Sequence, residues 1–214
     1  LAYGSVLGAV RHRGFIPWDK DIDIMIEIDK IDQFLSILES KLPEKYKVYS
    51  INSDEKYDSL KPRVGLNDCN HHLIHVDIFP MVGISHNKMA RKVLPRISYL
   101  LYKTFFLKKF DSNTVHKDNP IKRIKHRLVK GILFIIPINL IRHFFNYLSW
   151  KYPVSESTYI YNICGSYGLR EVIPKEYLNE PVYMEFEGYN LPVPKEWHKY
   201  LQHMYGDYMT PVKF

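Results

Sequence analysis

The sequence predicts an α+β protein: a mixed sheet flanked by helices, with an inserted helical region. Short segments of alternating hydrophobic and polar residues occur before residue 84 and again after residue 150, whereas the region between them has helical periodicity. With 214 residues, of which 46% are hydrophobic and 25% charged, the chain is long enough to bury a substantial core. We expect a core domain at 1–84, a helical region at 85–150 and a part at 151–214 that completes the core.

The first segment, Tyr3–His12, has the pattern of a strand that ends at Gly4-Ser5 and opens into a helix. Free backbone N–H groups and the helix dipole at such a junction favour a phosphate group. Gly4 and Ser5 are therefore candidate phosphate ligands.

The second segment, Asp21–Ile28, alternates acidic and hydrophobic residues with period two. This pattern predicts a strand that buries its isoleucines and places Asp21 and Asp23 together on the other face. Asp29 is a plausible N-cap for a helix that runs to Pro43.

Three further segments have the composition of strands: Lys45–Ile51, Leu60–Leu66 and His72–Phe79. In the last of them Asp77 lies on the opposite face from Val76 and Ile78. If this strand neighbours the one containing Asp21, three carboxylates converge on one site.

The region from Arg91 to Trp150 is helical in period. Two stretches, starting at Pro120 and after Pro137, each have an apolar stripe opposite polar residues. Such helices either pack on the sheet or lie in a membrane interface. The apolar run at 131–138 is too short to span a bilayer, which needs roughly 18 residues.

Positive charge is concentrated in this helical region. Residues 85–130 contain 13 Lys and Arg against two acids, a local charge of +11, so the rest of the chain carries −4 of the total of +7. We interpret this as a local anionic partner, with peripheral membrane contact through 120–150 as one reading. A nucleic-acid partner is not expected, because the basic residues lack interleaved stacking aromatics.

The C-terminal part has a strand signal at Tyr183–Phe186, with Gly188 as the turn residue. Pro194 can start a helix with an aromatic packing face, and Gly206 can end it. Core packing and ligand contact are both open for these aromatics.

The acids Asp21, Asp23 and Asp77 are candidates for a metal site. Close like charges repel unless a proton or a cation neutralises them, and hard oxygen donors suit Mg²⁺, or Mn²⁺ in its place. Solvent-exposed strand acids are the alternative, and it is weakened by Gly4-Ser5 upstream, since a phosphate cradle facing a metal suits phosphoryl transfer.

Together, Gly-Ser, Asp-x-Asp on the next strand and a lone strand Asp resemble the signature of the nucleotidyltransferase superfamily. The stretch from Tyr3 to Asp23 closely resembles the opening motif of the LicD family, which includes fukutin and fukutin-related protein. Later blocks resembling that family are Val76–Pro80, Gly168–Tyr177, Phe186–Gly188 and Leu201–Met209. Lys20 replaces a third acid common in the family, and we expect it to face away from the site. Since family members usually have a helix and most of a strand before Tyr3, we expect this sequence to be trimmed at that end.

The resemblance implies a metal-assisted transferase that moves phosphocholine, or a similar phospho-alcohol, from a CDP-linked donor to a sugar hydroxyl. The acceptor would be a cell-surface glycan or its lipid-linked precursor, and the enzyme would act in the cytoplasm at the inner face of the cell membrane. Asp21, Asp23 and Asp77 would be the catalytic and metal-binding residues, with Asp77 also holding the acceptor hydroxyl, either through the metal or as a general base. Alternatives are a nucleotidyltransferase that attacks the other phosphorus, a transferase using CDP-ribitol or CDP-glycerol, and a non-catalytic scaffold.

Additional substrate-binding candidates combine cationic, polar and aromatic groups near the expected site. Guanidinium groups match phosphate oxygens, and an aromatic face attracts a quaternary ammonium. These candidates are Gly4, Ser5, Arg11, His12, Trp18 and Arg63.

Overall fold

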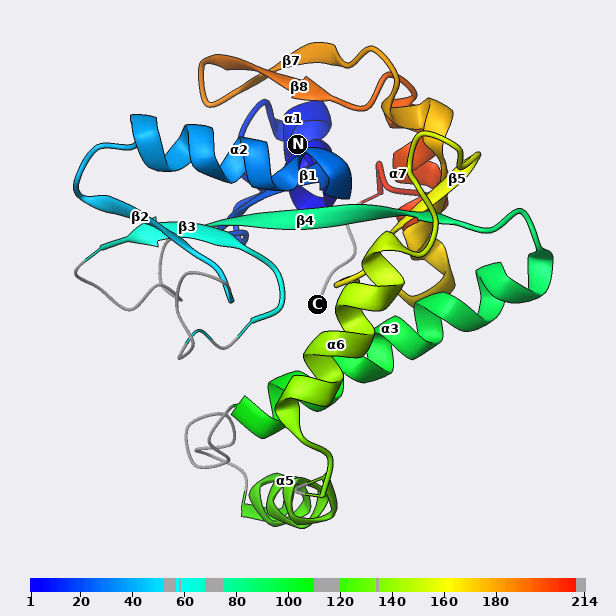
Figure 1. Ribbon diagram of the computed structural model, residues 1–214. Coiled ribbons are helices and arrows are strands. Elements are labelled where there is room, and N and C mark those ends of the chain that lie inside the picture. The colour runs from blue at the N-terminus through cyan, green and yellow to red at the C-terminus, as the bar shows by residue number, and fades with distance from the viewer. Residues whose placement is uncertain (52–56, 58, 68–74, 110–119, 134, 211–214) are drawn as a thin grey trace.

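The protein is described by a computed structural model that covers residues 1–214 except 52–56, 58, 68–74, 110–119, 134 and 211–214. A long central strand, β4, pairs in parallel with β1 and antiparallel with β3 and β5 (Figure 1). The strands of the six-stranded sheet are β1 (Ile22–Glu27), β2 (Tyr46–Tyr49), β3 (Arg63–Leu66), β4 (His75–Ile84), β5 (Tyr159–Asn162) and β6 (Val172–Pro174). Their order is β2-β3-β4-β5-β6, with β1 beside β4. The predicted mixed sheet of an α+β fold is confirmed.

Strand β4 is longer than the sequence predicts, because it continues through Pro80 to Ile84. The backbone N–H of Ile78 donates to the Pro62 carbonyl, so it points to the edge of β4 that pairs with β3. The backbone of residue 80, two positions on, points to the same edge. There β3 pairs only with residues 75–77, and β5 pairs with residues 81–84. Pro80 therefore sits between the two partners, where its missing N–H removes no ladder bond.

Two helices flank the first strand. Helix α1 (Tyr3–His12) begins at Tyr3, so the prediction that Gly4-Ser5 ends a strand is wrong: both residues lie in the first helical turn. Helix α2 (Ile28–Lys41) begins one residue before the predicted N-cap at Asp29 and ends before Pro43. Helix ends commonly differ by a residue from a prediction made on capping signals alone.

The helical region consists of α3 (Lys88–Lys109), α5 (Pro120–Leu133) and α6 (Ile138–Trp150). In Figure 1, α3 and α6 run together away from the sheet, with α5 at their far end. The predicted helical character is confirmed. Within the described residues no single helix has the length and hydropathy to cross a membrane, whereas α5 and α6, bent at 82° to each other, pass that test only as a pair.

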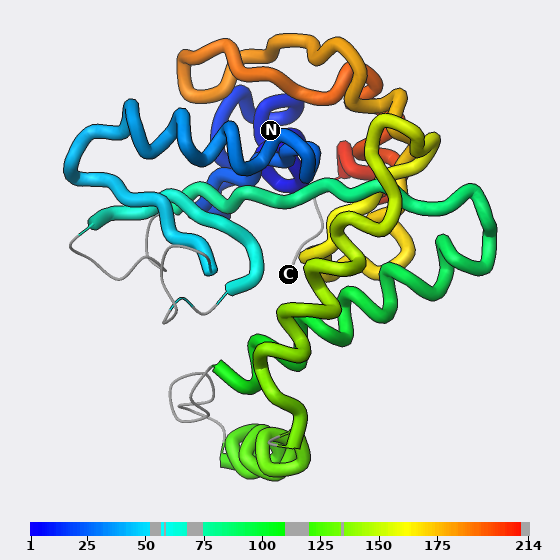
Figure 2. The backbone as a smooth tube through the Cα atoms, viewed as in Figure 1, coloured from blue at the N-terminus to red at the C-terminus, as the bar shows by residue number. Residues whose placement is uncertain are grey.

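The C-terminal part adds the hairpin of β7 (Val182–Phe186) and β8 (Tyr189–Val193) and the helix α7 (Trp197–Tyr205). Glu187 and Gly188 both have positive φ, at 51° and 79°, which is the backbone of a tight two-residue hairpin turn. Gly206, at φ 73°, follows α7 as predicted. Figure 2 shows the N-terminal segment beside this hairpin, where the Leu1 amine donates to the Pro192 carbonyl at 2.5 Å.

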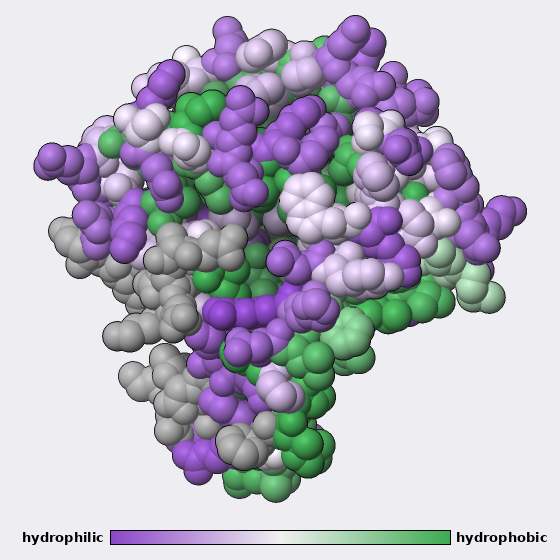
Figure 3. Space-filling model, viewed as in Figure 1, coloured by the Kyte–Doolittle hydropathy of each residue, from purple (hydrophilic) through white to green (hydrophobic). Residues whose placement is uncertain are grey.

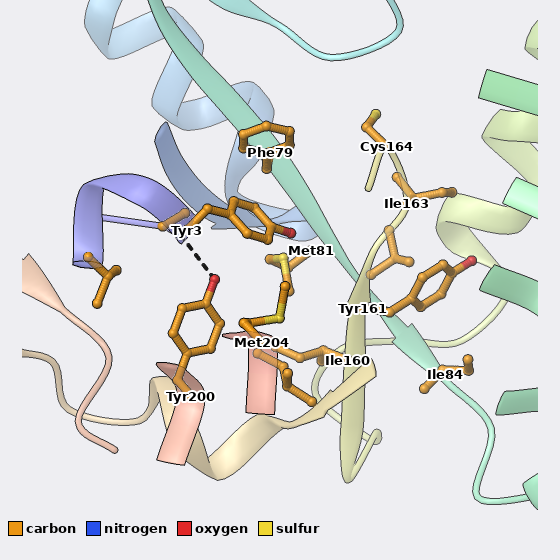
Figure 4. Packing of buried hydrophobic residues seen from close by; sticks show 14 of the residues in the cluster. Tyr3, Phe79, Met81, Ile84, Ile160, Tyr161, Ile163, Cys164, Tyr200 and Met204 are labelled. Atoms are coloured by element: carbon orange, nitrogen blue, oxygen red, sulfur yellow. Dashed lines mark hydrogen bonds between the residues drawn. The ribbon is translucent and has the colours of Figure 1, made fainter. Parts of the chain in front are cut away.

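The main hydrophobic cluster joins α1, α7 and the sheet (Figure 4). The backbone N–H of Tyr3 donates to the Tyr200 hydroxyl at 3.2 Å, and the Tyr3 ring packs edge-on against Phe79 at 5.1 Å. The first turn of α1 is therefore anchored to the core next to the strands that carry the acids.

Candidate active site

The predicted acids lie on neighbouring strands. The parallel register of β1 and β4 places Asp23 directly opposite Asp77, and the antiparallel register of β3 and β4 places Arg63 on the other side of Asp77. Because side chains two apart on a strand share a face, Asp21 and His75 form the next row on that face. Two rows of titratable groups thus cross the sheet side by side.

Asp77 is held by two cations. Its Oδ1 accepts from Arg63 Nε at 2.7 Å, and its Oδ2 contacts Lys61 Nζ. Burial acts to raise the pKa of Asp77, but the hydrogen bond from His75 and the charges of Lys61 and Arg63 outweigh it and hold the pKa well below its ordinary value. Asp77 is therefore a permanently ionised carboxylate.

Asp21, His75 and Asp77 form the cluster best placed to hold a metal. One ligand atom from each lies within 4.8 Å of the others. His75 Nε2 is 3.4 Å from an Asp21 oxygen and 3.7 Å from an Asp77 oxygen, and the proximity of these two carboxylates raises the pKa of His75. The sequence predicted Asp23 as the third ligand, in place of His75. Asp23 lies next to this cluster, on β1 directly opposite Asp77 of β4. Two carboxylates and an imidazole are suitable ligands for a divalent cation.

Asp23 and Asp19 carry the uncompensated negative charge. Burial and the charge of Asp21 raise the pKa of Asp23 to about 7, Asp77 and Asp19 add to that effect, and the positive charge of Lys61 opposes it only in part. Burial, together with a hydrogen bond to Asp21, raises the pKa of Asp19 to about 6. Asp21 is the opposite case, because its hydrogen bond with His75 lowers its pKa. A cation bound between these strands would relieve the repulsion.

The first turn of α1 fixes the backbone of Asp23. The Ser5 hydroxyl accepts from the Asp23 N–H at 2.9 Å, and the Ala2 N–H donates to the Asp23 carbonyl at 2.8 Å. Gly4 allows Asp19 to approach, since a Cβ at Gly4 would lie 2.6 Å from an Asp19 oxygen. The Gly-Ser pair therefore positions the acidic strand, and the buried Ser5 side chain is outside the pocket.

These acids open onto a pocket of about 300 Å³ that has an acidic side and an aromatic side. Its floor is a buried polar network in which the Tyr3 hydroxyl contacts Glu171 at 2.5 Å and accepts from Asn162 at 2.7 Å. Burial raises the pKa of Glu171. The aromatic lining residues are Tyr3, Phe79, Tyr102, Tyr167 and Tyr205. Such a pocket can take a ligand with one phosphate-bearing end and one apolar or cationic end.

The other predicted substrate ligands lie apart from the described lining of this pocket. Arg11 donates to the Tyr208 carbonyl at 2.9 Å, His12 is exposed in the last turn of α1, and Trp18 is 57% exposed on the loop before β1. Arg63 reaches the site through its ion pair with Asp77. Lys20 is exposed and Asp19 lines the pocket. The role of each in binding substrate stays a prediction.

Sequence reasoning missed several residues that the structure brings to the site. His75 and Lys61 had a usable signal, because each lies two positions before a residue already singled out, Asp77 and Arg63, on a segment of strand composition. Glu171 lies in the block Gly168–Tyr177 that resembles the family, but its pattern does not mark it as a pocket residue, and Tyr167 had no local signal. They reach the pocket through a 3₁₀ turn, η1 (Gly168–Glu171), at the end of β5.

Comparison with known proteins gives two matches. The family described as LicD/FKTN/FKRP, nucleotidyltransferase domain, matches residues 1–117. The chain is also similar to the lipopolysaccharide cholinephosphotransferase LicD of Haemophilus influenzae, with 29% identity over an alignment of 231 residues that covers 98% of this chain and 81% of that protein. The family match spans α1 and every strand that carries the acids.

Proposed function

This chain belongs to the LicD family of transferases, and we propose that it transfers phosphocholine from CDP-choline to a sugar hydroxyl of a glycan. The resemblance to a lipopolysaccharide cholinephosphotransferase over nearly the whole chain supports this class of reaction. A glycan of the cell surface, or its lipid-linked precursor, is the proposed acceptor.

The observation that carries the proposal is the two-sided pocket. The acidic rows of β1 and β4 suit a metal-bound diphosphate, and the aromatic wall suits a quaternary ammonium, which is attracted to ring faces. Tyr167 is 44% exposed and therefore available to a ligand. Phosphocholine combines both chemical groups in one small molecule. Lys61 Nζ already lies 4.1 Å from the centre of the Phe79 ring, so the choline group would meet the other aromatic residues, such as Tyr167, and a phospho-polyol has no ammonium group to place there.

Asp21, His75 and Asp77 would hold a divalent cation, with Asp23 beside them. Mg²⁺ or Mn²⁺ bound there would neutralise charge on the donor diphosphate during transfer. Lys61, now on Asp77, can turn its three N–H donors toward a phosphate oxygen, because its flexible stem allows that movement. Asp77 is a poor proton acceptor, since two cations hold its oxygens, so we assign it to metal positioning and not to general base catalysis.

A donor panel tests the proposal. The protein is incubated with Mg²⁺, a glycan acceptor and CDP-choline, CDP-ribitol or CDP-glycerol in turn, and released CMP is quantified. We expect release with CDP-choline to exceed release with either polyol donor by at least tenfold. Faster release from CDP-ribitol or CDP-glycerol would identify that polyol, and not choline, as the transferred alcohol. The absence of release from all three would reject the reaction class.

Membrane contact is part of the proposal. Exposed hydrophobic residues recur on one face of α5 and continue on α6, and Figure 3 shows hydrophobic surface along the outer edge of this region. We propose that this face rests on the inner surface of the cell membrane, where Lys and Arg meet anionic headgroups. The exposed apolar residues are Ile121, Ile124, Leu128, Ile132, Ile135, Leu140, Phe144 and Tyr147.

Vesicle binding tests this contact. Neutralising Lys122, Arg123 and Lys125 together should weaken partitioning to vesicles containing phosphatidylglycerol by about 1 kcal/mol per charge. Neutralising Lys195, just before α7, and Lys199, within α7, serves as a control that also lowers the net charge. Unchanged partitioning in the α5 variant would contradict the proposed contact.

A further inference from the structure

A cavity of about 500 Å³ lies between α2, α6 and residues 50, 51, 60 and 62, apart from the acidic pocket. The two cavities open on opposite sides of the same chain segments. Leu60, Pro62 and Pro80 line the larger cavity, whereas their neighbours Lys61 and Phe79 line the acidic pocket. The volume is in the range of roughly 300–1,000 Å³ that is typical of small-molecule sites.

Helix α6 presents three different faces. Ile141, Phe145 and Leu148 are buried in the core, while Leu140 and Phe144 belong to the exposed apolar surface. The third face lines the cavity at helical spacings of three and four residues. It consists of Asn139, Arg142, His143, Asn146 and Trp150, and the core residue Phe145 and Ser149 line the cavity at its edge.

The polar groups on this third face lack partners. Arg142 Nε is buried without a hydrogen bond, and within the described part of the chain its guanidinium makes no ion pair. Neither Asn139 nor Asn146 makes a side-chain hydrogen bond to another described residue. Among these side chains the buried donor is Arg142 Nε, whereas Asn139 and Asn146 are exposed and can reach water. A buried donor without an acceptor costs roughly 1–3 kcal/mol, so Arg142 is suited to a ligand that supplies an acceptor, with the two exposed amides beside it.

The opposite wall is apolar and contributed mainly by α2. Ile28, Ile31 and Leu35 form it, and Asp32 is the one acidic residue among the described residues that line the cavity. One wall thus offers hydrophobic surface, and the other offers amide, imidazole and guanidinium donors with an exposed indole at Trp150. Sugars match this combination, because their C–H faces pack on apolar and aromatic groups while their hydroxyls accept hydrogen bonds. The guanidinium adds affinity for a phosphate oxygen.

We propose that this cavity binds a phosphorylated sugar unit of the acceptor glycan, away from the hydroxyl that reacts. The inference rests on the proposed function for its acceptor, but the binding itself requires neither donor nor metal. Arg142 binds the phosphate group, Asn139 and Asn146 hydrogen-bond to hydroxyls, and Trp150 packs on the sugar ring. A glycan held at both cavities would be selected by a feature remote from the reacting centre.

The test is direct binding, measured by calorimetry with glucose 6-phosphate, glucose and inorganic phosphate in the absence of CDP-choline and Mg²⁺. We expect glucose 6-phosphate to bind at least tenfold more tightly than glucose or phosphate alone. Arg142→Met should weaken binding at least tenfold, whereas Lys151→Met, which removes a positive charge from the end of the same helix outside the cavity, should leave it unchanged. Equal binding by wild type and Arg142→Met, no binding by wild type, or phosphate binding as tight as the sugar phosphate would each overturn the proposal.

Two further measurements separate this site from other causes. Removing the unpaired Nε should leave the melting temperature of Arg142→Met equal to or above that of wild type, so a lower melting temperature would indicate a structural arginine and reject the ligand role. Asp23→Asn should retain full glucose 6-phosphate binding although it loses transfer. If wild type released no CMP but still bound glucose 6-phosphate, the proposed function would be rejected and the binding site would stand.

Discussion

The acidic pocket and the outer helical region differ in how their charges are balanced. Asp77 is neutralised from within the fold by Lys61 and Arg63, and its strand position is fixed by three pairing partners. The helices α5 and α6 instead expose a hydrophobic face, and segment 85–130 carries an excess of positive charge. The charges around Asp77 are therefore arranged without a ligand, whereas the helical region is suited to an external anionic surface.

Within the pocket the acids also divide into two kinds. The negative charge of Asp77 is balanced by two adjacent cations. The charge of Asp23 is balanced only in part, because Asp23 is buried among other carboxylates. We therefore expect the same Asp→Asn change at these two positions to affect turnover similarly and stability in opposite directions.

The largest effect is expected on turnover. Asp23→Asn should lower the rate of CMP release roughly 10³-fold, since the loss of a charge beside the metal removes several kcal/mol of transition-state stabilisation. The rate is measured under saturating CDP-choline and Mg²⁺. Asp207→Asn, at an exposed position beyond α7, is the matched control and should retain wild-type turnover. A rate within fivefold of wild type for Asp23→Asn would remove Asp23 from the site.

The second effect is on folding stability. Asp77→Asn should lower the free energy of unfolding by about 3 kcal/mol, because it leaves the buried Lys61 ammonium without its carboxylate and replaces the charged acceptor of the Arg63 Nε hydrogen bond by a neutral one. Urea unfolding at pH 7 without metal measures the change. An unchanged midpoint would mean that the two cations have other partners in the metal-free protein.

The third effect is the pH dependence of Asp23. Its pKa is about 7 in the folded protein and 3.8 in a model peptide, so the native state binds the proton more tightly and stability falls as pH rises from about 4 through 7. Asp23→Asn should abolish this decline and exceed wild type by about 2 kcal/mol at pH 8 without metal. Unfolding midpoints at pH 5 and pH 8 give the comparison. Equal pH dependence of the two proteins would contradict the assigned repulsion, and added Mg²⁺ should narrow the gap at pH 8.

The smallest effect concerns the helical region. Leu128 is 64% exposed on the apolar face of α5, so Leu128→Gln should weaken partitioning to anionic vesicles by about 1 kcal/mol while the folding stability stays within 0.5 kcal/mol. Sedimentation with vesicles and thermal unfolding are measured on the same samples. A large loss of stability with unchanged partitioning would assign this face to internal packing.

Part of this architecture was predictable because it follows from local periodicity. Alternation along Asp21–Ile28 correctly predicted the strand β1 and the common face of Asp21 and Asp23, but the isoleucines of β1 are only half-buried and Ile28 belongs to α2. Helical periodicity correctly assigned α5 and α6. The register that sets Asp23 against Asp77 depends on a parallel pairing between segments about fifty residues apart, and no local pattern encodes it. For the same reason the cavity containing Arg142 was not predicted, since a polar helix face has the same sequence pattern whether it meets solvent or a cavity.

Transfer of phosphocholine from CDP-choline requires attack at the phosphorus that carries choline, whereas nucleotidyl transfer requires attack at the other phosphorus. Phosphorus NMR of a reaction containing CDP-choline, Mg²⁺ and a lipopolysaccharide-derived oligosaccharide identifies both products at once, and Asp23→Asn provides the inactive control. The expected result is CMP together with a new choline phosphodiester on the sugar. Free phosphocholine together with a CMP-modified oligosaccharide would show attack at the other phosphorus and would contradict phosphocholine transfer.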